Sequence, residues 1–252
     1  MPKHLRDIIL NCFGENLPSV LSSKNNVISD LYIHYLKPYS TQNVERIIIE
    51  LGNSESIGEV HRVVVLYLKF DFNQFLLLDD NEQNKVVLNN IHKAAMLCAE
   101  KFGWDENVFL DAYNLVVSVN YIYRVETPKK TSRDKKHKGS LLIEKNETNT
   151  IITVLFYNNQ EQLISTVELL KTFNSGGFHI PIIKKLKWFD NLSFGISLLN
   201  KQLVIRASLS ELKTLTDITP NDLPIEEIQG TLRQLTYQYL PDRKSRIAWA
   251  NQ

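Results

Sequence analysis

The sequence of 252 residues has little cysteine and no long apolar run, and each absence excludes a class of protein. Only Cys12 and Cys98 are present, which excludes a disulfide framework, and neither belongs to a Cys-x-x-Cys pair typical of zinc or redox sites. We expect both to be buried thiols. The longest purely apolar runs, residues 63–68 and 94–99, are far shorter than the roughly 18 residues of a membrane-spanning helix. The sequence therefore predicts no transmembrane segment.

The beginning of the sequence also lacks the pattern of a secretory signal. Its apolar patch, residues 8–10, ends at Asn11, and no small-residue cleavage site follows. We therefore expect a cytoplasmic protein with no membrane partner.

The common motifs of nucleotide binding and hydrolysis are missing as well. Walker A, G-x-S-x-G, H-E-x-x-H and G-x-G-x-x-G patterns are absent, and the glycine pair Gly176 and Gly177 is not followed by a helix start. The six histidines show no pair at the spacing of metal ligands. We therefore expect no catalytic residue, no metal site and no cofactor.

Charge is unevenly distributed, although the formal net charge is only +1. Residues 1–126 contain 11 Lys or Arg against 16 Asp or Glu, which gives −5, so residues 127–252 carry +6. Most of this excess lies in residues 129–138, where six basic residues accompany a single aspartate. The six basic residues are Lys129, Lys130, Arg133, Lys135, Lys136 and Lys138.

The basic segment has two interpretations. Its Lys and Arg side chains are of the type that contacts phosphates and releases counterions, which indicates a nucleic-acid-binding loop, assisted by Arg243, Lys244 and Arg246 near the end of the sequence. The alternative is a solvated loop without such a role, because no aromatic residue is interleaved for base stacking and like charges resist ordering.

The clearest helix signal covers residues 81–102. Asp80-x-x-Gln83 resembles a capping box, and Gly103 is placed to end the helix. Five apolar residues at spacings of 3, 4, 3 and 4 form a stripe that faces a core: Leu88, Ile91, Ala95, Cys98 and Phe102. His92 lies on the flank of this stripe, so we expect its replacement to cost little stability. Further helices are expected over residues 3–13, from Pro18 into residues 22–26, from Asp105 to about residue 115, and over residues 225–239.

Alternation of apolar and polar residues predicts many strands joined by short turns. Residues 163–172 fit a helix or a strand, and the turn at Asn158 and Asn159 favours a strand. The expected strands cover residues 27–36, 44–51, 60–72, 117–125, 140–144, 150–157, 163–172, 182–189, 192–199 and 202–209.

These elements predict an α+β fold. Short connections imply an antiparallel meander, and the two central helices are expected to cover one of its faces, with further helices towards both ends of the sequence. We expect a single domain over residues 1–252 with a basic loop at 128–139. The alternative is two domains, residues 1–126 and 140–252.

Several stretches give the chain a resemblance to a known group. These are FDFNQF at residues 70–75, the helical residues 86–104 that end in FGW, the basic loop, and KLKW at residues 185–188. Over residues 60–210 this pattern resembles uncharacterised bacterial proteins similar to polymorphic-toxin immunity proteins. The resemblance implies a small non-catalytic protein that binds and neutralises one partner protein. It carries no functional residue over to this sequence.

The leading hypothesis is therefore a non-enzymatic protein-binding factor of the immunity or antitoxin type. Its candidate partner contacts are tryptophan and arginine residues, because these are over-represented at interface hot spots. They are Trp188, Trp249, Arg243 and Arg246.

A nucleic-acid-binding module that uses residues 129–138 is the first alternative, and a magnesium-dependent nuclease is the second. Such a nuclease places an aspartate and then Glu-x-Lys on neighbouring strands, so that carboxylates hold Mg²⁺ and the lysine assists the attacking water. Asp190 followed by Glu211 and Lys213 has that order.

Overall fold

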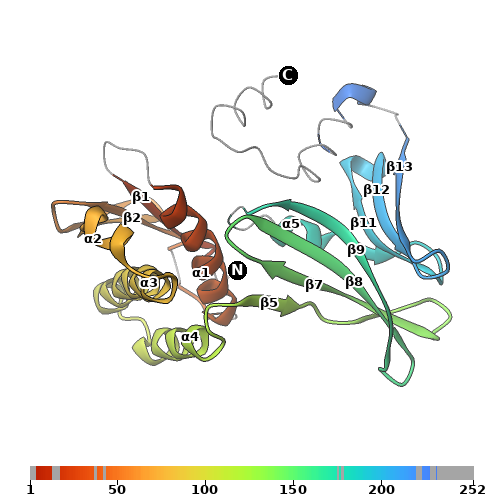
Figure 1. The fold of residues 1–252 in the computed structure, drawn as a ribbon, viewed down its shortest axis with the longest axis horizontal. Coiled ribbons are helices and arrows are strands. Elements are labelled where there is room, and N and C mark those ends of the chain that lie inside the picture. The colour runs from red at the N-terminus through yellow and green to blue at the C-terminus, as the bar shows by residue number, and fades with distance from the viewer. Residues whose placement is uncertain are drawn as a thin grey trace. The chain divides into compact units, whose positions relative to one another are not determined.

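The computed structural model describes residues 4–12, 18–36, 39–41, 44–174, 176, 179–219, 223–227 and 231 (Figure 1). Helices and largely antiparallel sheets occur together, which confirms the α+β class. The chain divides into two compact units, Met1–Tyr123 with Ser175–Gly177 and Arg124–Asn174 with Phe178–Gln252. The number of domains stays a prediction. Within the described residues, no helix is both long and apolar enough to cross a membrane.

The first unit is a mixed sheet with helices. Its elements are β1 (Asp7–Cys12), α1 (Ser19–Leu36), β2 (Arg46–Gly52), β3 (Ser56–Val60), β4 (Val63–Lys69), α2 (Phe72–Leu77), α3 (Asp80–Phe102) and α4 (Glu106–Ser118). The strand order is β1-β2-β4-β3, with β1, β2 and β4 parallel and β3 antiparallel to β4. β3 is therefore an edge strand.

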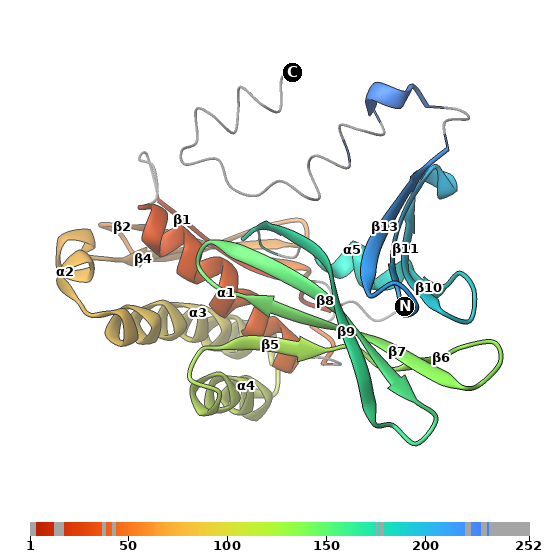
Figure 2. The same cartoon turned by 45° about the vertical axis from the view of Figure 1, so that its right-hand side comes forward.

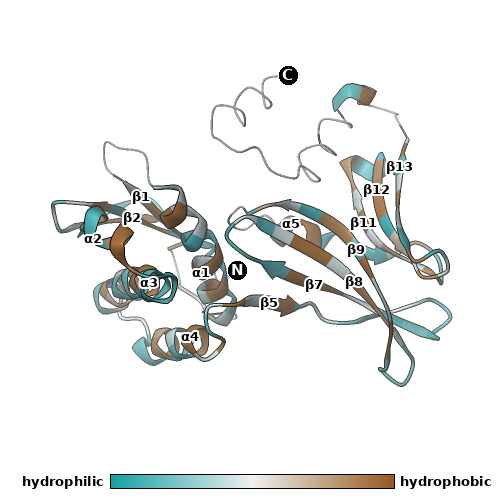
Figure 3. Cartoon of the chain, viewed as in Figure 1, coloured by the Kyte–Doolittle hydropathy of each residue, from teal (hydrophilic) through white to brown (hydrophobic). Residues whose placement is uncertain are grey.

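The core of this unit lies between the sheet and the helices. Along β2, Ile47, Ile49 and Leu51 are buried, whereas the residues between them are half-buried. α1 contacts β1, α3 contacts β2 and β4, and α1, α3 and α4 contact one another. Apolar and polar residues alternate along α1 and α4, as expected of helices with one buried side (Figure 3).

α3 follows its sequence signals closely. Asp79 is the N-cap: its carboxylate accepts from the Glu82 amide at 2.8 Å, and the Glu82 side chain accepts from the Asp79 amide at 3.2 Å. The capping box therefore lies one residue before the predicted one. Gly103, with a φ of 66°, ends the helix. Within the predicted stripe Phe102 is half-buried, and the other four residues, Leu88, Ile91, Ala95 and Cys98, are buried.

Two local predictions in this unit are wrong, and two others are only partly correct. The expected helix over residues 3–13 is strand β1, because Ile8 and Leu10 alternate toward the core and pair along β2. The expected strand over residues 27–36 belongs to helix α1. The expected strand over residues 60–72 includes the β3–β4 turn, where His61 has a φ of 55°. The expected strand over residues 117–125 begins as the last turn of α4.

The second unit contains two antiparallel sheets (Figure 2). One has the order β5-β7-β8-β9 with β6 beside β7, and the other has the order β10-β11-β12-β13. The elements are β5 (Tyr123–Glu126), β6 (Lys130–Thr131), β7 (His137–Lys145), β8 (Asn149–Asn158), β9 (Leu163–Phe173), α5 (His179–Lys184), β10 (Leu186–Trp188), β11 (Ser193–Leu198), the 3-10 turn Leu199–Lys201, β12 (Leu203–Ser208) and β13 (Lys213–Ile218).

The antiparallel meander is present as expected, but the two central helices do not cover it. The described strands form three sheets, and α3 and α4 pack in the first unit, where the sheet is mainly parallel. The meanders β7–β8–β9 and β10–β13 belong to the second unit. The hairpins expected at residues 140–157 and 150–172 are confirmed. Most of the helix expected over residues 225–239 lies outside the described residues.

Candidate functional site

The tryptophan predicted as a partner contact belongs to the core of the second unit. Trp188 is buried, lies 4.8 Å from the Phe194 ring and 5.9 Å from the Phe156 ring between centroids, and donates from Nε1 to the Lys130 carbonyl at 2.8 Å. This position corrects the expectation that Trp188 meets a partner. The other predicted contacts, Trp249, Arg243 and Arg246, lie outside the described residues, as does Lys244.

The basic segment forms an ordered hairpin rather than a long loop. Lys130 pairs with Gly139 and Thr131 with Lys138, which leaves a short turn between β6 and β7. In that turn the Ser132 hydroxyl and the Lys136 amide donate to Asp134 at 2.7 and 3.1 Å. These hydrogen bonds, that of Ser132 above all, hold the pKa of Asp134 below its ordinary value.

Half of the predicted nucleic-acid contacts are engaged within the protein. Lys138 and Lys129 donate to Glu161 at 2.6 and 3.1 Å, and they hold the pKa of that carboxylate below its ordinary value. The Lys129 ammonium also lies 4.1 Å from the centre of the Tyr157 ring. Lys130 donates to the Leu186 carbonyl at 2.7 Å. The predicted contacts that remain exposed at the hairpin tip are Arg133, Lys135 and Lys136.

The residues of the nuclease hypothesis lie at one end of the β10–β13 sheet, with Asp190 and Glu211 in turns and Lys213 at the start of β13. Lys213 pairs with Glu211 at 2.7 Å, and Asp190 lies 3.6 Å from Arg206. Burial raises the pKa of Asp190, but hydrogen bonds from Leu192 and Ser193 outweigh it and leave the pKa below its ordinary value. No cluster of three or more His, Cys, Asp or Glu placed to hold a metal is found in the described part of the chain.

His92 on α3 has a buried partner that the sequence pattern did not reveal. Its Nδ1 lies 3.0 Å from the hydroxyl of Tyr32, which is buried, and its ring lies 4.7 Å from that of Tyr113. We therefore expect its replacement to cost more stability than its position on the flank of the stripe indicated. Nearby on α3, burial raises the pKa of Cys98 to about 12, which agrees with a structural thiol.

We expect the His92 site to lose stability in mild acid. Burial lowers the pKa of His92 in the folded protein, so the unfolded chain binds a proton at this histidine more readily. The stabilisation is therefore fully present above about pH 6.5, the ordinary pKa of histidine, and is lost as the pH falls toward the folded-state pKa. Melting curves at about pH 7.5 and 5.5 should show a larger fall for the parent protein than for His92→Gln. Equal falls in the two proteins would contradict this interpretation.

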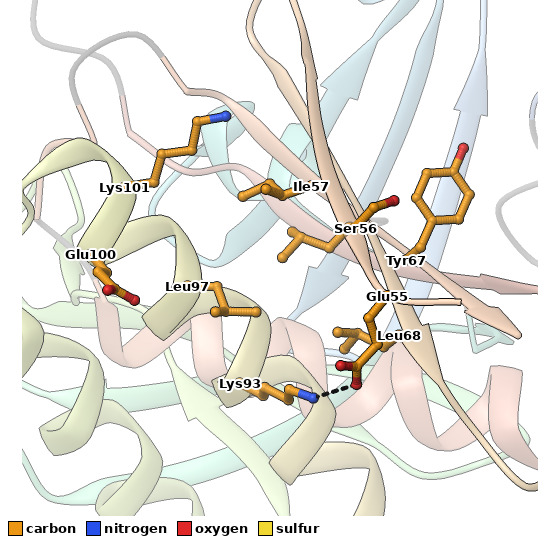
Figure 4. Close-up of a pocket in the computed structure, with 10 residues that line it drawn as sticks. Glu55, Ser56, Ile57, Tyr67, Leu68, Lys93, Leu97, Glu100 and Lys101 are labelled. Atoms are coloured by element: carbon orange, nitrogen blue, oxygen red, sulfur yellow. Dashed lines mark hydrogen bonds and ion pairs between the residues drawn. The ribbon is translucent and has the colours of Figure 1, made fainter. Parts of the chain in front are cut away.

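A candidate surface site lies in the first unit between β3 and α3. A pocket of about 630 Å³ opens there, and we call it the edge groove (Figure 4). Its lining residues are Glu55, Ser56, Ile57, Leu66, Tyr67, Leu68, Lys93, Leu97, Glu100 and Lys101.

Apolar side chains from three elements shape the edge groove. Leu66 and Leu68 are buried residues of β4. Ile57 of β3 and Leu97 of α3 point into the space between strand and helix and keep 40% and 36% of their surface exposed (Figure 4). The buried residues of the α3 stripe face the sheet, whereas Leu97, which precedes Cys98, lies at the margin of that helix face. Sequence periodicity located α3 correctly but gave no signal for Ile57, which is 40 positions from Leu97.

Within the described residues, no strand pairs with the outer edge of β3, which is therefore open. β4 pairs with one side of it, with Ser56 opposite Tyr67 and Ile57 opposite Leu66, and β3 ends the strand order of the sheet. Residues 53–59 are exposed, and a Cβ atom added at Gly58 would contact only the Val65 carbonyl, at 3.9 Å. An exposed strand edge offers backbone N–H and C=O groups to another extended chain.

Charged residues flank the apolar centre of the edge groove. Glu55 accepts from Lys93 at 2.9 Å, and that hydrogen bond holds the pKa of Glu55 below its ordinary value (Figure 4). Both side chains are half exposed, so the pair contributes little to stability. Glu100 and Lys101 lie further along α3 (Figure 4). A ligand in this groove would meet apolar surface at its centre and charges at its margins.

No family model, curated protein or solved structure matches the chain.

Proposed function

We propose that this protein is a non-enzymatic binding protein whose edge groove holds an extended segment of a partner protein. The observation that carries the proposal is the open edge of β3 next to the exposed apolar side chains of Ile57 and Leu97. Backbone pairing along β3 supplies affinity, and a side chain inserted between strand and helix supplies specificity, as in other cases of strand addition. A protein of the immunity or antitoxin type, which the sequence pattern resembles, would act in this way.

The chemistry of the groove indicates what the partner segment contains. Its centre requires an apolar side chain, because Ile57, Leu97 and Leu66 offer no polar group of their own. The charges that line the groove balance, with Glu55 and Glu100 against Lys93 and Lys101, whereas residues 1–126 as a whole carry a net charge of −5. We therefore propose a segment in which basic residues flank an apolar one, since complementary charge favours encounter.

The test begins with a partner recovered in stoichiometric amount from the native host and then purified. Ile57→Lys and Leu97→Lys should each weaken its binding by about tenfold or more, because a lysine ammonium would be placed in an apolar centre. Leu110→Lys on α4 is the matched control, since Leu110 is 46% exposed and lies outside the groove. Binding by this control should stay within about twofold of the parent.

Hydrogen exchange supplies an independent readout of strand addition. The backbone amides of residues 56–60 should gain protection when the partner binds, because an added strand takes up their free hydrogen-bonding groups. Unchanged exchange in β3, or equal losses in the groove variants and the Leu110→Lys control, would disprove the proposal. Turnover of a substrate by the protein without any partner would also contradict it.

A further inference from the structure

A second pocket, of about 740 Å³, lies in the second unit and is lined by lysines without any carboxylate. It is found where the end of α5 and the start of β10 meet the turn between β11 and β12. We call it the lysine pocket, after Lys184, Lys185, Lys187 and Lys201. None of these residues belongs to the basic segment at 129–138.

The local sequence places these lysines together. Leu186 and Trp188 of β10 are buried, so the alternation of the strand directs Lys187 to the opposite, outer side. Lys201 follows Leu199 and Asn200 in a turn where all three residues have positive φ, at 48°, 51° and 73°. Non-glycine residues rarely adopt this conformation, because the Cβ atom crowds the following carbonyl oxygen. The surrounding strands thus hold Lys201 at the pocket in a strained turn.

The lysine pocket has no carboxylate partner among the residues that the structure describes. In the described part of the chain, none of its four lysines forms an ion pair, and the ammonium of Lys187 lies 4.9 Å from the centre of the Phe189 ring. By contrast, Lys129 and Lys138 of the same unit share Glu161. Four ammonium groups around one pocket repel one another, so a bound anion would relieve this repulsion.

We propose that the lysine pocket binds a small ligand that carries two or more phosphate groups. Its volume lies within the range of about 300–1,000 Å³ typical of small-molecule sites. Several negative charges are needed to match four lysines, which a single phosphate does not supply. Leu198 and Leu223 add an apolar wall against which an organic part of the ligand would rest. We therefore expect the pocket to recognise the phosphate chain that inorganic and nucleoside polyphosphates share.

Calorimetric titration with inorganic triphosphate and with a nucleoside triphosphate tests this proposal. The parent protein should bind at about 50 mM salt and more weakly at about 200 mM, because the contacts are electrostatic. Replacing two pocket lysines, Lys187→Gln with Lys201→Gln, should lower the affinity by about tenfold or more. The matched control, Lys135→Gln with Lys136→Gln, removes the same charge from the hairpin tip and should bind within about twofold of the parent.

Comparison of the two probes identifies the ligand. Tighter binding of the nucleoside triphosphate would mean that its organic part contacts the apolar wall. Equal binding of the two probes would mean that the pocket recognises the polyphosphate alone. The proposal fails if neither probe binds at about 1 mM in low salt, or if the hairpin-tip control loses as much affinity as the pocket variant.

Discussion

Ile91→Asp is expected to leave little folded protein. Ile91 is fully buried in α3, on the side that packs against the sheet of the first unit. A carboxylate at this position loses its hydration and gains no cationic partner, at a cost of several kcal/mol. That cost is of the same order as the whole stability of a typical domain, about 5–15 kcal/mol.

Soluble yield, far-ultraviolet circular dichroism and thermal melting of this variant would show the effect. Ile91→Val removes one methyl group and should cost only about 0.5–1.5 kcal/mol. Asn89→Asp is the charge-matched control, because Asn89 is exposed on the same helix and its Oδ1 accepts from the Tyr113 hydroxyl at 2.9 Å, a role that aspartate keeps. An Ile91→Asp protein that melts like its parent would mean that α3 does not cover the sheet.

Among substitutions that add a single methyl group to a described glycine, Gly195→Ala is expected to cause the largest loss of folding stability. A Cβ atom at Gly195 would clash with the Ile205 carbonyl oxygen and would lie 2.6 Å from the Cα of Arg206. Both atoms belong to the backbone of β12, which pairs with β11 along its whole length, so neither moves without disturbing the sheet. We expect a loss of about 3 kcal/mol, because overpacking of this kind forces the backbone apart.

The matched control for Gly195→Ala is Gly58→Ala in β3. There the added Cβ meets only the Val65 carbonyl oxygen, at 3.9 Å, which is ordinary contact. For a chain of this size a loss of about 3 kcal/mol lowers the melting temperature by about 6–12 °C, whereas the control should melt within a few degrees of the parent. Equal melting temperatures for the two variants would contradict the close approach of β11 and β12.

The two proposed sites differ in charge as well as in place. The edge groove lies in the first unit, within the half of the sequence that carries −5, and the lysine pocket lies in the half that carries +6. A partner segment with basic residues and a ligand with phosphate groups therefore have no reason to compete. Failure of either experiment leaves the other proposal standing, because no residue is shared between the two sites.

Local signals in the sequence determined the elements whose stabilisation is itself local. The apolar period of α3, its acidic cap and Gly103 all act within a few residues, and the hairpins of β7, β8 and β9 follow from alternation and short polar turns. The first β-strand and first α-helix were misassigned because short apolar runs, such as residues 8–10 and 27–28, fit either state. Parallel pairing with β2 makes the first of these segments, residues 7–12, a strand.

Only the tertiary structure decided which residues are available for binding. The sequence neighbours of Trp188 and Lys129 predicted that both side chains are accessible. Long-range packing buries the Trp188 indole, and Lys129 donates to Glu161, 32 positions away. Ile57 and Leu97 had no local signal, because their exposure depends on how an edge strand and a helix margin meet. Alternation and helical period specify which way a side chain faces along its own element. What lies opposite that side chain is fixed by contacts between distant segments, and those contacts require the whole fold.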